Sequence, residues 1–219
     1  RIDGAGKKVT RSDNCRVSDL SVSSDNLTFT YEAKSLPYPI DTSYYDNEKH
    51  TQADALSVIP FMDEMNYEGL SVSGLSDGYY GLTIGREFIG RFTARELERG
   101  INMALLQNTP QYKQAMKIRQ MNEERWLKER KMREFYWVEY NLMRKTGMLW
   151  ACNEAAVDTL RKYRPHDIFL QWNGDLWLQY MHKGIREDCV NEQQDLVNQI
   201  YEQNKPIPLR IEIKKFTDL

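Results

Sequence analysis

Apolar and polar residues alternate in the first third of the chain, and this alternation predicts β-strands there. In "LTFTYEA", Leu27, Phe29 and Tyr31 are separated by single polar residues, a period of two that is typical of a half-buried strand. "RVSDLSV" has a similar pattern just before it, and "RIDGAGKKVT" indicates a strand, a turn and a second strand. Residues 1–40 are therefore predicted to be rich in β-structure.

The next stretch changes from a helical to a strand pattern. "TQADALSVIPFMDEMN" has helical spacing after an N-cap at Thr51, and Pro60 should kink or divide that helix. Residues 68–92 return to alternation, with turn signals at Ser76–Gly78 and Gly85–Glu87. These signals predict a meander of roughly three strands.

A series of helix-boundary signals follows. Thr93 and Glu96 have the spacing of a capping box, in which each side chain bonds to the backbone N–H of the other residue, and Gly100 suits a helix end. Thr109 then caps a new helix. Its first residue, Pro110, has no N–H group, so no hydrogen-bond partner is needed there. We assign structural roles to all five residues.

One long helix is predicted from Pro110 to about Lys145, on the order of 50 Å at the rise of an α-helix. Its first half is charged. Its second half, "FYWVEYNLM", is apolar nearly all round and should be buried, including Trp137 and Val138. "NEAAVDTLRKY" then predicts a shorter helix that stops before Pro165.

The remaining pattern defines the fold class. Residues 176–203 should be mainly helical with an interruption at Gly184, and alternating apolar and charged residues predict a closing strand within 208–216. Because residues 94–204 are mainly helical, we predict an α+β fold: a small antiparallel sheet or meander packed on a helical bundle with one long helix. No repeat or low-complexity linker divides the sequence, so residues 1–219 are interpreted as a single domain.

Composition and charge argue against two classes of protein. The 30 basic residues are balanced by 32 acidic ones, and the net charge of −2 does not suit a nucleic-acid-binding surface. No apolar run approaches the ~20 residues that a membrane span needs. The chain begins with Arg1 rather than Met and shows no signal peptide, so we expect the natural protein to continue upstream.

Motifs for metals and cofactors are absent from the sequence. Cys15, Cys152 and Cys189 are widely spaced, so neither a disulfide framework nor a thiolate metal site is expected. No H-x-x-x-H, no calcium-binding loop, no phosphate-binding loop and no G-x-G-x-x-G occurs. We therefore expect no metal and no cofactor.

Candidate catalytic residues are also few. A serine or cysteine hydrolase must bring a nucleophile, a base and an orienting group together. Of the three histidines, His50 lies in a polar loop, His166 follows a proline and His182 lies in a charged helix, and each context is more typical of a surface residue than of a base. No G-x-S-x-G elbow is present, and no catalytic residue is assigned.

One face of the long helix is a candidate binding site. Its residues recur at spacings of four, three and four, which places them on one side: Asn122, Trp126, Glu129 and Arg133. An indole with an amide, a carboxylate and a guanidinium can bind a sugar or a polar ester. A contact between helices, bordered by a Glu129–Arg133 ion pair, explains the same pattern and is favoured.

Asn102 is a further candidate because it follows the helix end at Gly100. An Asn in this position can bond to backbone groups and close the turn, which is the role we prefer. Its amide could equally point toward an ester or a sugar in a neighbouring catalytic domain.

Six blocks of sequence occur in one order along the chain: "SLPYPID", "QADALSVIPFMDEMN", "LSVSGLSDGYYGLTI", "FTARELERGINMA", "TPQYKQA" and "IYEQNKP". Together they resemble the C-terminal region of bacterial SGNH/GDSL-type hydrolases, a family of lipases and acylhydrolases that are often secreted. The resemblance covers about residues 2–213. It implies an upstream catalytic domain in the same polypeptide and a secreted or periplasmic location.

The catalytic motifs of that family are not found in this chain. It has no Gly-Asp-Ser, and Asn47, Tyr163 and Gln179 stand where an Asp-x-x-His motif would need aspartate. The resemblance therefore implies a non-catalytic C-terminal accessory domain that packs on the catalytic domain and shapes or covers its cleft. The alternatives are a carbohydrate-binding module that uses exposed aromatic residues, and an enzyme with an unrecognised site.

Overall fold

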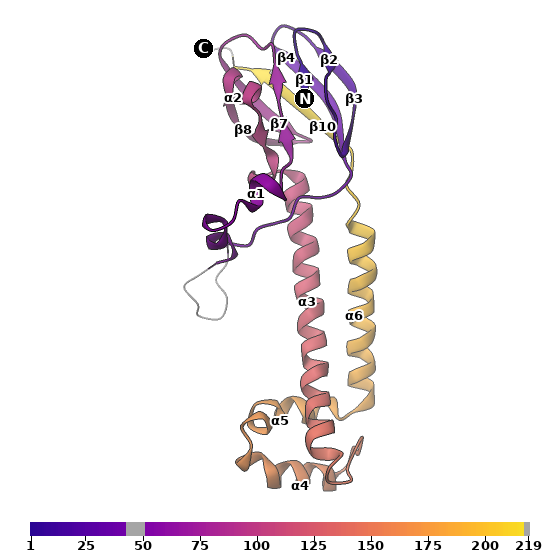
Figure 1. The fold of residues 1–219 in the computed structure, drawn as a ribbon. Coiled ribbons are helices and arrows are strands. Elements are labelled where there is room, and N and C mark those ends of the chain that lie inside the picture. The colour runs from indigo at the N-terminus through magenta and orange to yellow at the C-terminus, as the bar shows by residue number, and fades with distance from the viewer. Residues whose placement is uncertain (43–50, 217–219) are drawn as a thin grey trace. The chain divides into compact units, whose positions relative to one another are not determined.

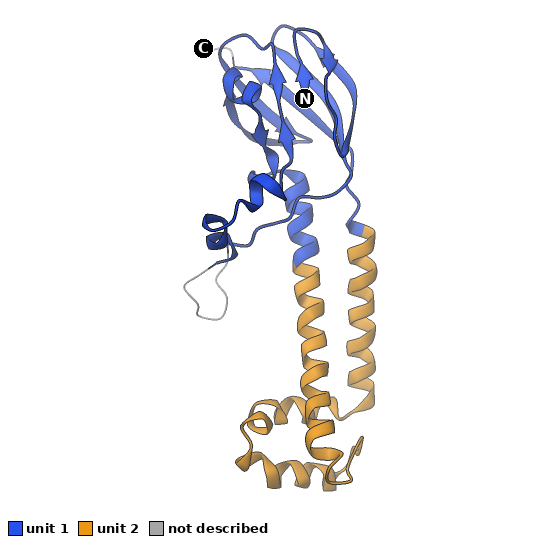
Figure 2. Ribbon diagram, in the orientation of Figure 1, with its two compact units in different colours: residues 1–119, 203–219 blue, residues 120–202 orange. Residues whose placement is uncertain are grey.

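The chain divides into two compact units of different construction. The computed structural model describes residues 1–42 and 51–216. Unit 1 comprises Arg1–Arg119 and Gln203–Leu219, and unit 2 comprises Gln120–Glu202 (Figure 2). The described strands all belong to unit 1, and unit 2 is helical, which confirms the predicted α+β class. The interpretation of residues 1–219 as a single accessory domain stays a prediction.

Unit 1 is built on a five-stranded antiparallel sheet in the order β3-β4-β10-β7-β8 (Figure 1). Its strands are β3 (Cys15–Val22), β4 (Asn26–Ala33), β7 (Tyr79–Ile84), β8 (Glu87–Thr93) and β10 (Leu209–Lys215). The predicted closing strand β10 lies between β4 and β7, where Ile211 faces Phe29 on one side and Ile84 on the other. All three side chains are buried, so the last strand of the chain completes the core of the first unit.

Two smaller sheets complete the β-structure of unit 1. Their strands are β1 (Ile2–Asp3), β2 (Lys8–Val9) and β6 (Val72–Ser73) in one, and β5 (Gly69–Leu70) and β9 (Ile101–Asn102) in the other. The strand-turn-strand expected at the N-terminus is present. In the region of the expected meander, β7 and β8 form a hairpin, but β6 pairs in parallel with β1. The turn at Ser76–Gly78 therefore connects two sheets, because β7 already lies between β8 and β10.

The helical stretch after Thr51 is divided at Pro60, as predicted. Its two pieces are η1, a 3₁₀ helix (Gln52–Ser57), and α1 (Phe61–Glu64). Thr51 caps the first piece and donates its N–H to the Asp54 carboxylate over 2.6 Å. The polar loop predicted before it, with His50, lies outside the described residues.

The boundary signals around residue 100 are confirmed. The elements concerned are α2 (Ala94–Arg99) and the short 3₁₀ helix η2 (Met103–Leu105). Thr93 donates its N–H to the Glu96 carboxylate at 2.7 Å, and its hydroxyl accepts the Glu96 N–H at 3.2 Å. The Thr93 N–H and the Thr93 hydroxyl, which also donates to the Glu96 carboxylate at 2.7 Å, hold the pKa of Glu96 below its usual range. Gly100 has a φ of 99°, and the Thr109 hydroxyl accepts the N–H of Tyr112.

Unit 2 consists of paired long helices and shorter ones at one end (Figure 1). The elements are α3 (Pro110–Val138), the π-helical turn η3 (Glu139–Met143), α4 (Glu154–Tyr163), η4 (Arg164–His166), α5 (Ile168–Tyr180) and α6 (Lys183–Gln203). Within the unit, α3 and α6 lie side by side. Lys128 Nζ is 2.6 Å from Glu192 Oε2, and Cys189 Sγ is 3.7 Å from the Lys128 carbonyl oxygen.

Two details of the helical prediction differ from the structure. α5 begins at Ile168, before the expected start at residue 176, because Asp167 caps it by accepting the N–H groups of Phe169 and Leu170. The interruption falls at Met181 and His182, whereas Gly184 lies inside α6. A glycine in a helix costs only about 1 kcal/mol relative to alanine, which tertiary packing readily overcomes.

The apolar end of the long helix is buried on one side only. Phe135 and Val138 are fully buried, as predicted for the latter. Trp137 is half-buried, and Tyr136 and Tyr140 are 38% and 48% exposed, so the prediction of burial all round is wrong for these three. The helix contacts its neighbours in the unit along a stripe, and the opposite face remains in solvent.

Candidate functional site

Asn102 joins three segments of unit 1 through backbone contacts. Its Oδ1 accepts the N–H of Ala104 at 3.1 Å and that of Glu68 at 2.9 Å. Its Nδ2 donates to the carbonyl oxygens of Met62, at 2.8 Å, and Asn66, at 3.1 Å. Every polar atom of the side chain is therefore engaged in holding the fold, the kind of role that we preferred for it. A contact with a ligand stays a prediction.

The candidate residues on the long helix lie together in part. Arg133 Nε is 2.9 Å from Glu129 Oε1, and the Arg133 guanidinium carbon lies 5.9 Å from the centre of the Trp126 ring. Trp126 is 47% exposed, so its ring is accessible in this unit. Asn122 instead accepts a bond from Arg125 Nε at 3.1 Å. The expected ion pair is present, and ligand binding at this face stays a prediction.

A cavity of about 300 Å³ opens in unit 1 beside the first strand. Its apolar lining includes the buried Ile2, Phe29, Met103 and Ile211. Its polar lining includes three exposed arginines from separate segments: Arg1, Arg11 and Arg99. Within the described part of the chain, the guanidinium groups of Arg1 and Arg99 form no ion pair. The lining also includes Asp13, which pairs with Arg11, so it combines apolar surface with a net positive charge, which favours a partner or ligand that is both apolar and anionic.

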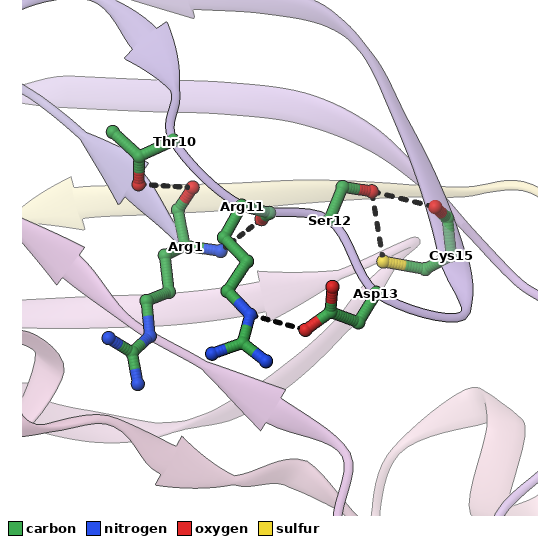
Figure 3. A network of polar contacts seen from close by, with 6 residues as sticks. All are labelled: Arg1, Thr10, Arg11, Ser12, Asp13 and Cys15. Carbon is green, nitrogen blue, oxygen red and sulfur yellow. Dashed lines mark hydrogen bonds and ion pairs between the residues drawn. The ribbon is translucent and has the colours of Figure 1, made fainter.

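A short polar network positions the rim of this cavity (Figure 3). The Arg1 nitrogen donates to the Arg11 carbonyl oxygen at 2.6 Å, and Arg11 also forms an ion pair with Asp13. The Ser12 hydroxyl donates to the Cys15 carbonyl oxygen at 2.6 Å and lies 3.4 Å from its Sγ. In Figure 3 the side chains of Arg1 and Arg11 extend in the same direction. The loop after β2 is thereby fixed to β1, and both arginines are held at the rim.

A half-buried carboxylate lies at a neighbouring cavity of about 240 Å³. Glu68 Oε1 accepts the Tyr31 hydroxyl at 2.9 Å, and Gln111 Nε2 lies 3.3 Å from both carboxylate oxygens. Burial raises the pKa of Glu68, while the bonds from Tyr31 and Gln111 act in the opposite direction. Burial and the adjacent carboxylate likewise raise the pKa of Tyr31. Glu68 is therefore a carboxyl group at this site whose pKa lies above its usual range.

The two cavities of unit 1 share part of their lining. Cys15 and Tyr31 line both cavities. No described residue that lines either cavity is a histidine. The Oε1 of Gln111 is buried and has no hydrogen-bond partner among the described residues. It offers an acceptor that a bound molecule or a water could satisfy.

Unit 2 contains a contact that the sequence pattern did not predict. Cys152 Sγ lies 3.3 Å from His182 Nδ1, although the residues are 30 positions apart. His182 was expected within a helix, and it lies instead in the break between α5 and α6. A further cavity of about 360 Å³ in this unit is lined by Trp137, Lys145 and His166, among others, and neither Cys152 nor His182 borders it.

Two further features are missing from the described residues. No group of three or more His, Cys, Asp or Glu side chains in residues 1–42 and 51–216 could hold a metal ion. In the same residues, none of the helices has the length and apolar character needed to cross a membrane.

The helical region is similar to one class of domain. Residues 116–205 match a family described as the Diltiazem deacetylase C-terminal helical domain. The matched segment falls mostly within unit 2, from the second turn of α3 to just beyond the end of α6.

A particular solved structure is similar to nearly the whole chain. It is described as "BT4096 a gut microbial diltiazem-metabolizing enzyme", with 35% sequence identity and a TM-score of 0.91. The match covers 98% of this chain and 49% of that one, so the chain spans about half the length of the solved enzyme. No curated protein matches the chain.

These matches correct the resemblance drawn from the sequence blocks. The chain is similar to part of a diltiazem-metabolizing enzyme, and its helical region is similar to the C-terminal domain of diltiazem deacetylases. The assignment to SGNH/GDSL-type hydrolases is therefore wrong. Each of the quoted blocks is short and rich in turn and capping residues, which many unrelated α+β proteins need for the same local geometry. The secreted or periplasmic location depended on that resemblance alone and is untested.

Proposed function

We propose that this chain is the non-catalytic C-terminal part of a deacetylase-like ester hydrolase, whose catalytic part is supplied by the rest of a longer polypeptide. The observation that carries the proposal is the similarity to BT4096, at 35% identity over 98% of this chain but only 49% of the enzyme. The family described as a C-terminal helical domain of diltiazem deacetylase supports the same position in the polypeptide.

The chemistry of the described residues supports a non-catalytic role. Hydrolysis of an acetyl ester needs a nucleophile, a base and donors for the oxyanion around one substrate-sized space. The arginine-lined cavity of unit 1 provides space and positive charge, but no described histidine borders it. Cys152 and His182 are in contact but exposed, and they border none of the three cavities described above.

The arginine-lined cavity is the surface through which we propose that this part packs on the catalytic part. Arg1, Arg11 and Arg99 surround an apolar floor, so a complementary surface needs acidic and apolar side chains together. An interface of this kind would place β1, α2 and the loop after β2 beside the catalytic residues, where they would shape the substrate cleft.

The proposal is tested by comparing the 219-residue chain with the longer polypeptide that contains it. The substrates are 4-nitrophenyl acetate and diltiazem, and the measurement is acetate release against substrate concentration. The longer polypeptide should show saturable release, whereas the chain alone should show only the buffer rate. Saturable release by the chain alone that is lost in His182→Ala or His166→Ala would overturn the proposal, because the described histidines would then act as bases.

A second test examines the packing surface. Arg99→Glu in the longer polypeptide should raise KM or lower thermal stability by opposing the acidic partner surface. Arg161→Glu, at an exposed arginine of unit 2, should leave KM unchanged and cost at most about 1 kcal/mol through loss of its exposed pair with Asp158. If the two variants change KM and thermal stability equally, the cavity of unit 1 is not part of the interface.

A carbohydrate-binding module remains the second candidate, and the cavity of unit 2 is the observation that favours it. Trp137 supplies an aromatic wall, and Asn141, Lys145 and Asp167 supply polar groups suited to hydroxyls. A change in tryptophan fluorescence on titration with monosaccharides, lost in Trp137→Leu, would support this function. If neutral, amino and acidic sugars all leave the tryptophan fluorescence unchanged, the carbohydrate-binding function is excluded.

A further inference from the structure

The contact between Cys152 and His182 has the geometry of a thiol and its base. Sγ and Nδ1 are 3.3 Å apart, within the reach of a sulfur hydrogen bond. Both side chains are exposed, so a small reagent can approach the sulfur directly. The contact lies within unit 2 and does not depend on the deacetylase-related function proposed above.

Buried groups hold the backbone on the cysteine side of the contact. Glu139, which is 1% exposed, accepts the N–H of Trp150 through Oε2 at 2.9 Å and the indole N–H of Trp177 through Oε1 at 2.8 Å. Trp150 has a positive φ of 61°, a conformation that needs such support. Asn153 then caps α4 by accepting the N–H of Ala156 at 3.0 Å. Cys152 lies between these two anchored residues.

The histidine side is held in a similar way. Met181, the residue that follows α5, donates its N–H to the Trp177 carbonyl oxygen at 2.8 Å. Arg186 Nη1 donates to the carbonyl oxygens of Tyr180 and Met181 at 2.5 Å and 2.8 Å. His182 follows directly. Because Trp177 contacts both Glu139 and Met181, one buried residue links the supports of the two reacting side chains.

The two other cysteines provide an internal comparison. Cys189 is 4% exposed, and its sulfur lies near the Lys128 carbonyl oxygen and Gln193 Nε2, both at 3.7 Å. Cys15 is half-buried, and its sulfur faces the Ser12 hydroxyl. Within the described residues, Cys152 is the cysteine that contacts a histidine, and all three are free thiols.

We propose that Cys152 and His182 form a reactive thiol site that exchanges with low-molecular-weight disulfides. In the tautomer that carries its proton on Nε2, His182 Nδ1 accepts the thiol proton and leaves a thiolate paired with an imidazolium. The thiolate attacks one sulfur of the disulfide, and a new S–S bond to Cys152 forms as the old S–S bond breaks. The leaving thiolate takes up the proton held by His182.

The products of this exchange are one mixed disulfide on Cys152 and one free small thiol, so electrons and protons balance. An internal disulfide is not available within unit 2, because the other cysteine of this unit, Cys189, is buried in α6 against α3. The mixed disulfide is therefore the end product until a second small thiol removes it by the reverse exchange.

The experiment follows labelling of the intact protein by 5,5′-dithiobis(2-nitrobenzoic acid) and by oxidised glutathione, with each cysteine peptide quantified by mass spectrometry over time. Cys152 should be labelled first with both reagents, and Cys189 should be labelled only after denaturation. His182→Gln should slow labelling of Cys152 about tenfold, since the base that generates the thiolate is lost. His166→Gln, which replaces an exposed histidine of the same unit, should leave the rate unchanged.

Two results would overturn the proposal. One is labelling of Cys15 as fast as that of Cys152 in the folded protein. The other is an unchanged Cys152 rate in His182→Gln. Because His182 is exposed, this variant should keep the melting temperature of the parent. Should it melt earlier, the Cys152 rates are compared at a temperature where Cys189 stays unlabelled in both proteins, which separates loss of the base from loss of the fold.

Discussion

Each unit contains a glutamate that is held by hydrogen bonds away from full exposure to solvent, but in different surroundings. In unit 2, Glu139 is fully buried on the π-helical turn and accepts one N–H from Trp150 and one from Trp177. In unit 1, Glu68 is half-buried beside a cavity, and its donors are the Tyr31 hydroxyl and the Gln111 amide.

The difference separates a structural carboxylate from one that can respond to its surroundings. Glu139 ties a loop and a helix together, so its removal leaves the buried indole N–H of Trp177 and the part-buried backbone N–H of Trp150 without partners. Glu68 faces a cavity and has a raised pKa, so it can exchange a proton or meet a ligand. The stability of unit 2 is thus expected to fall when the buried hydrogen bonds of Glu139 are removed, whereas the stability of unit 1 is expected to depend on pH.

The largest expected effect comes from the tryptophan that meets Glu139. Trp177 is fully buried in α5, so Trp177→Ala should lower the free energy of unfolding by about 3–5 kcal/mol through lost burial and a cavity. Trp172, on the same helix, is 67% exposed and provides the matched control. Trp172→Ala should change stability by less than about 1 kcal/mol in urea titrations followed by circular dichroism. Equal effects would show that α5 is not packed as described.

Loss of the buried carboxylate should have the next largest effect. Glu139→Gln replaces one carboxylate oxygen, a hydrogen-bond acceptor, by an NH2 donor that faces an N–H group. The substitution should lower the free energy of unfolding by about 1–3 kcal/mol. The control is Glu129→Gln on the same helix, which removes only the exposed pair with Arg133 and should cost at most about 1 kcal/mol. A smaller loss in Glu139→Gln than in the control would contradict the structural role of Glu139.

A smaller effect is expected for the amide that joins segments of unit 1. Asn102→Ala removes bonds to four backbone groups and should lower stability by about 1–2 kcal/mol. Asn122→Ala, at an exposed position, should have a free energy of unfolding within about 0.5 kcal/mol of that of the parent. If Asn102 instead contacts substrate, stability will be unchanged while kcat/KM of the longer polypeptide falls.

The smallest effect should appear as a pH dependence of opposite sign at two glutamates of unit 1. The pKa of Glu68 is raised in the folded state, so its contribution to stability is present below its ordinary value of 4.5 and is lost as the pH rises. Glu68→Gln cannot ionise. Its free energy of unfolding relative to that of the parent should therefore increase between pH 4 and pH 7. Urea unfolding at both pH values measures the difference.

Glu96 provides the control with the reverse sign. Its pKa is lowered by the bonds from Thr93, so its contribution is present above the ordinary value and is lost as the pH falls. The free energy of unfolding of Glu96→Gln relative to that of the parent should therefore decrease between pH 4 and pH 7. The same direction of change in both variants would remove the contrast between the buried and the capping glutamate.

Local chemistry by itself determined most element boundaries. The alternation in "LTFTYEA", the capping box of Thr93 and Glu96, the positive φ of Gly100 and the division at Pro60 all follow from interactions within a few residues. The spacing of Glu129 and Arg133 likewise fixed their ion pair, because residues four apart on a helix are neighbours. These features need no knowledge of the rest of the fold.

Tertiary structure decided what depends on contacts between distant segments. Strand β10 enters the middle of the sheet, Glu68 meets Tyr31 and Gln111, and Cys152 meets His182 across 30 residues. It also decided that Trp177 is buried while Trp137 is half-exposed, although both lie in apolar helical sequence. The physical reason is that hydrophobic burial is non-directional: a sequence specifies which residues gain by leaving water, whereas the packing of the elements chooses which of them do.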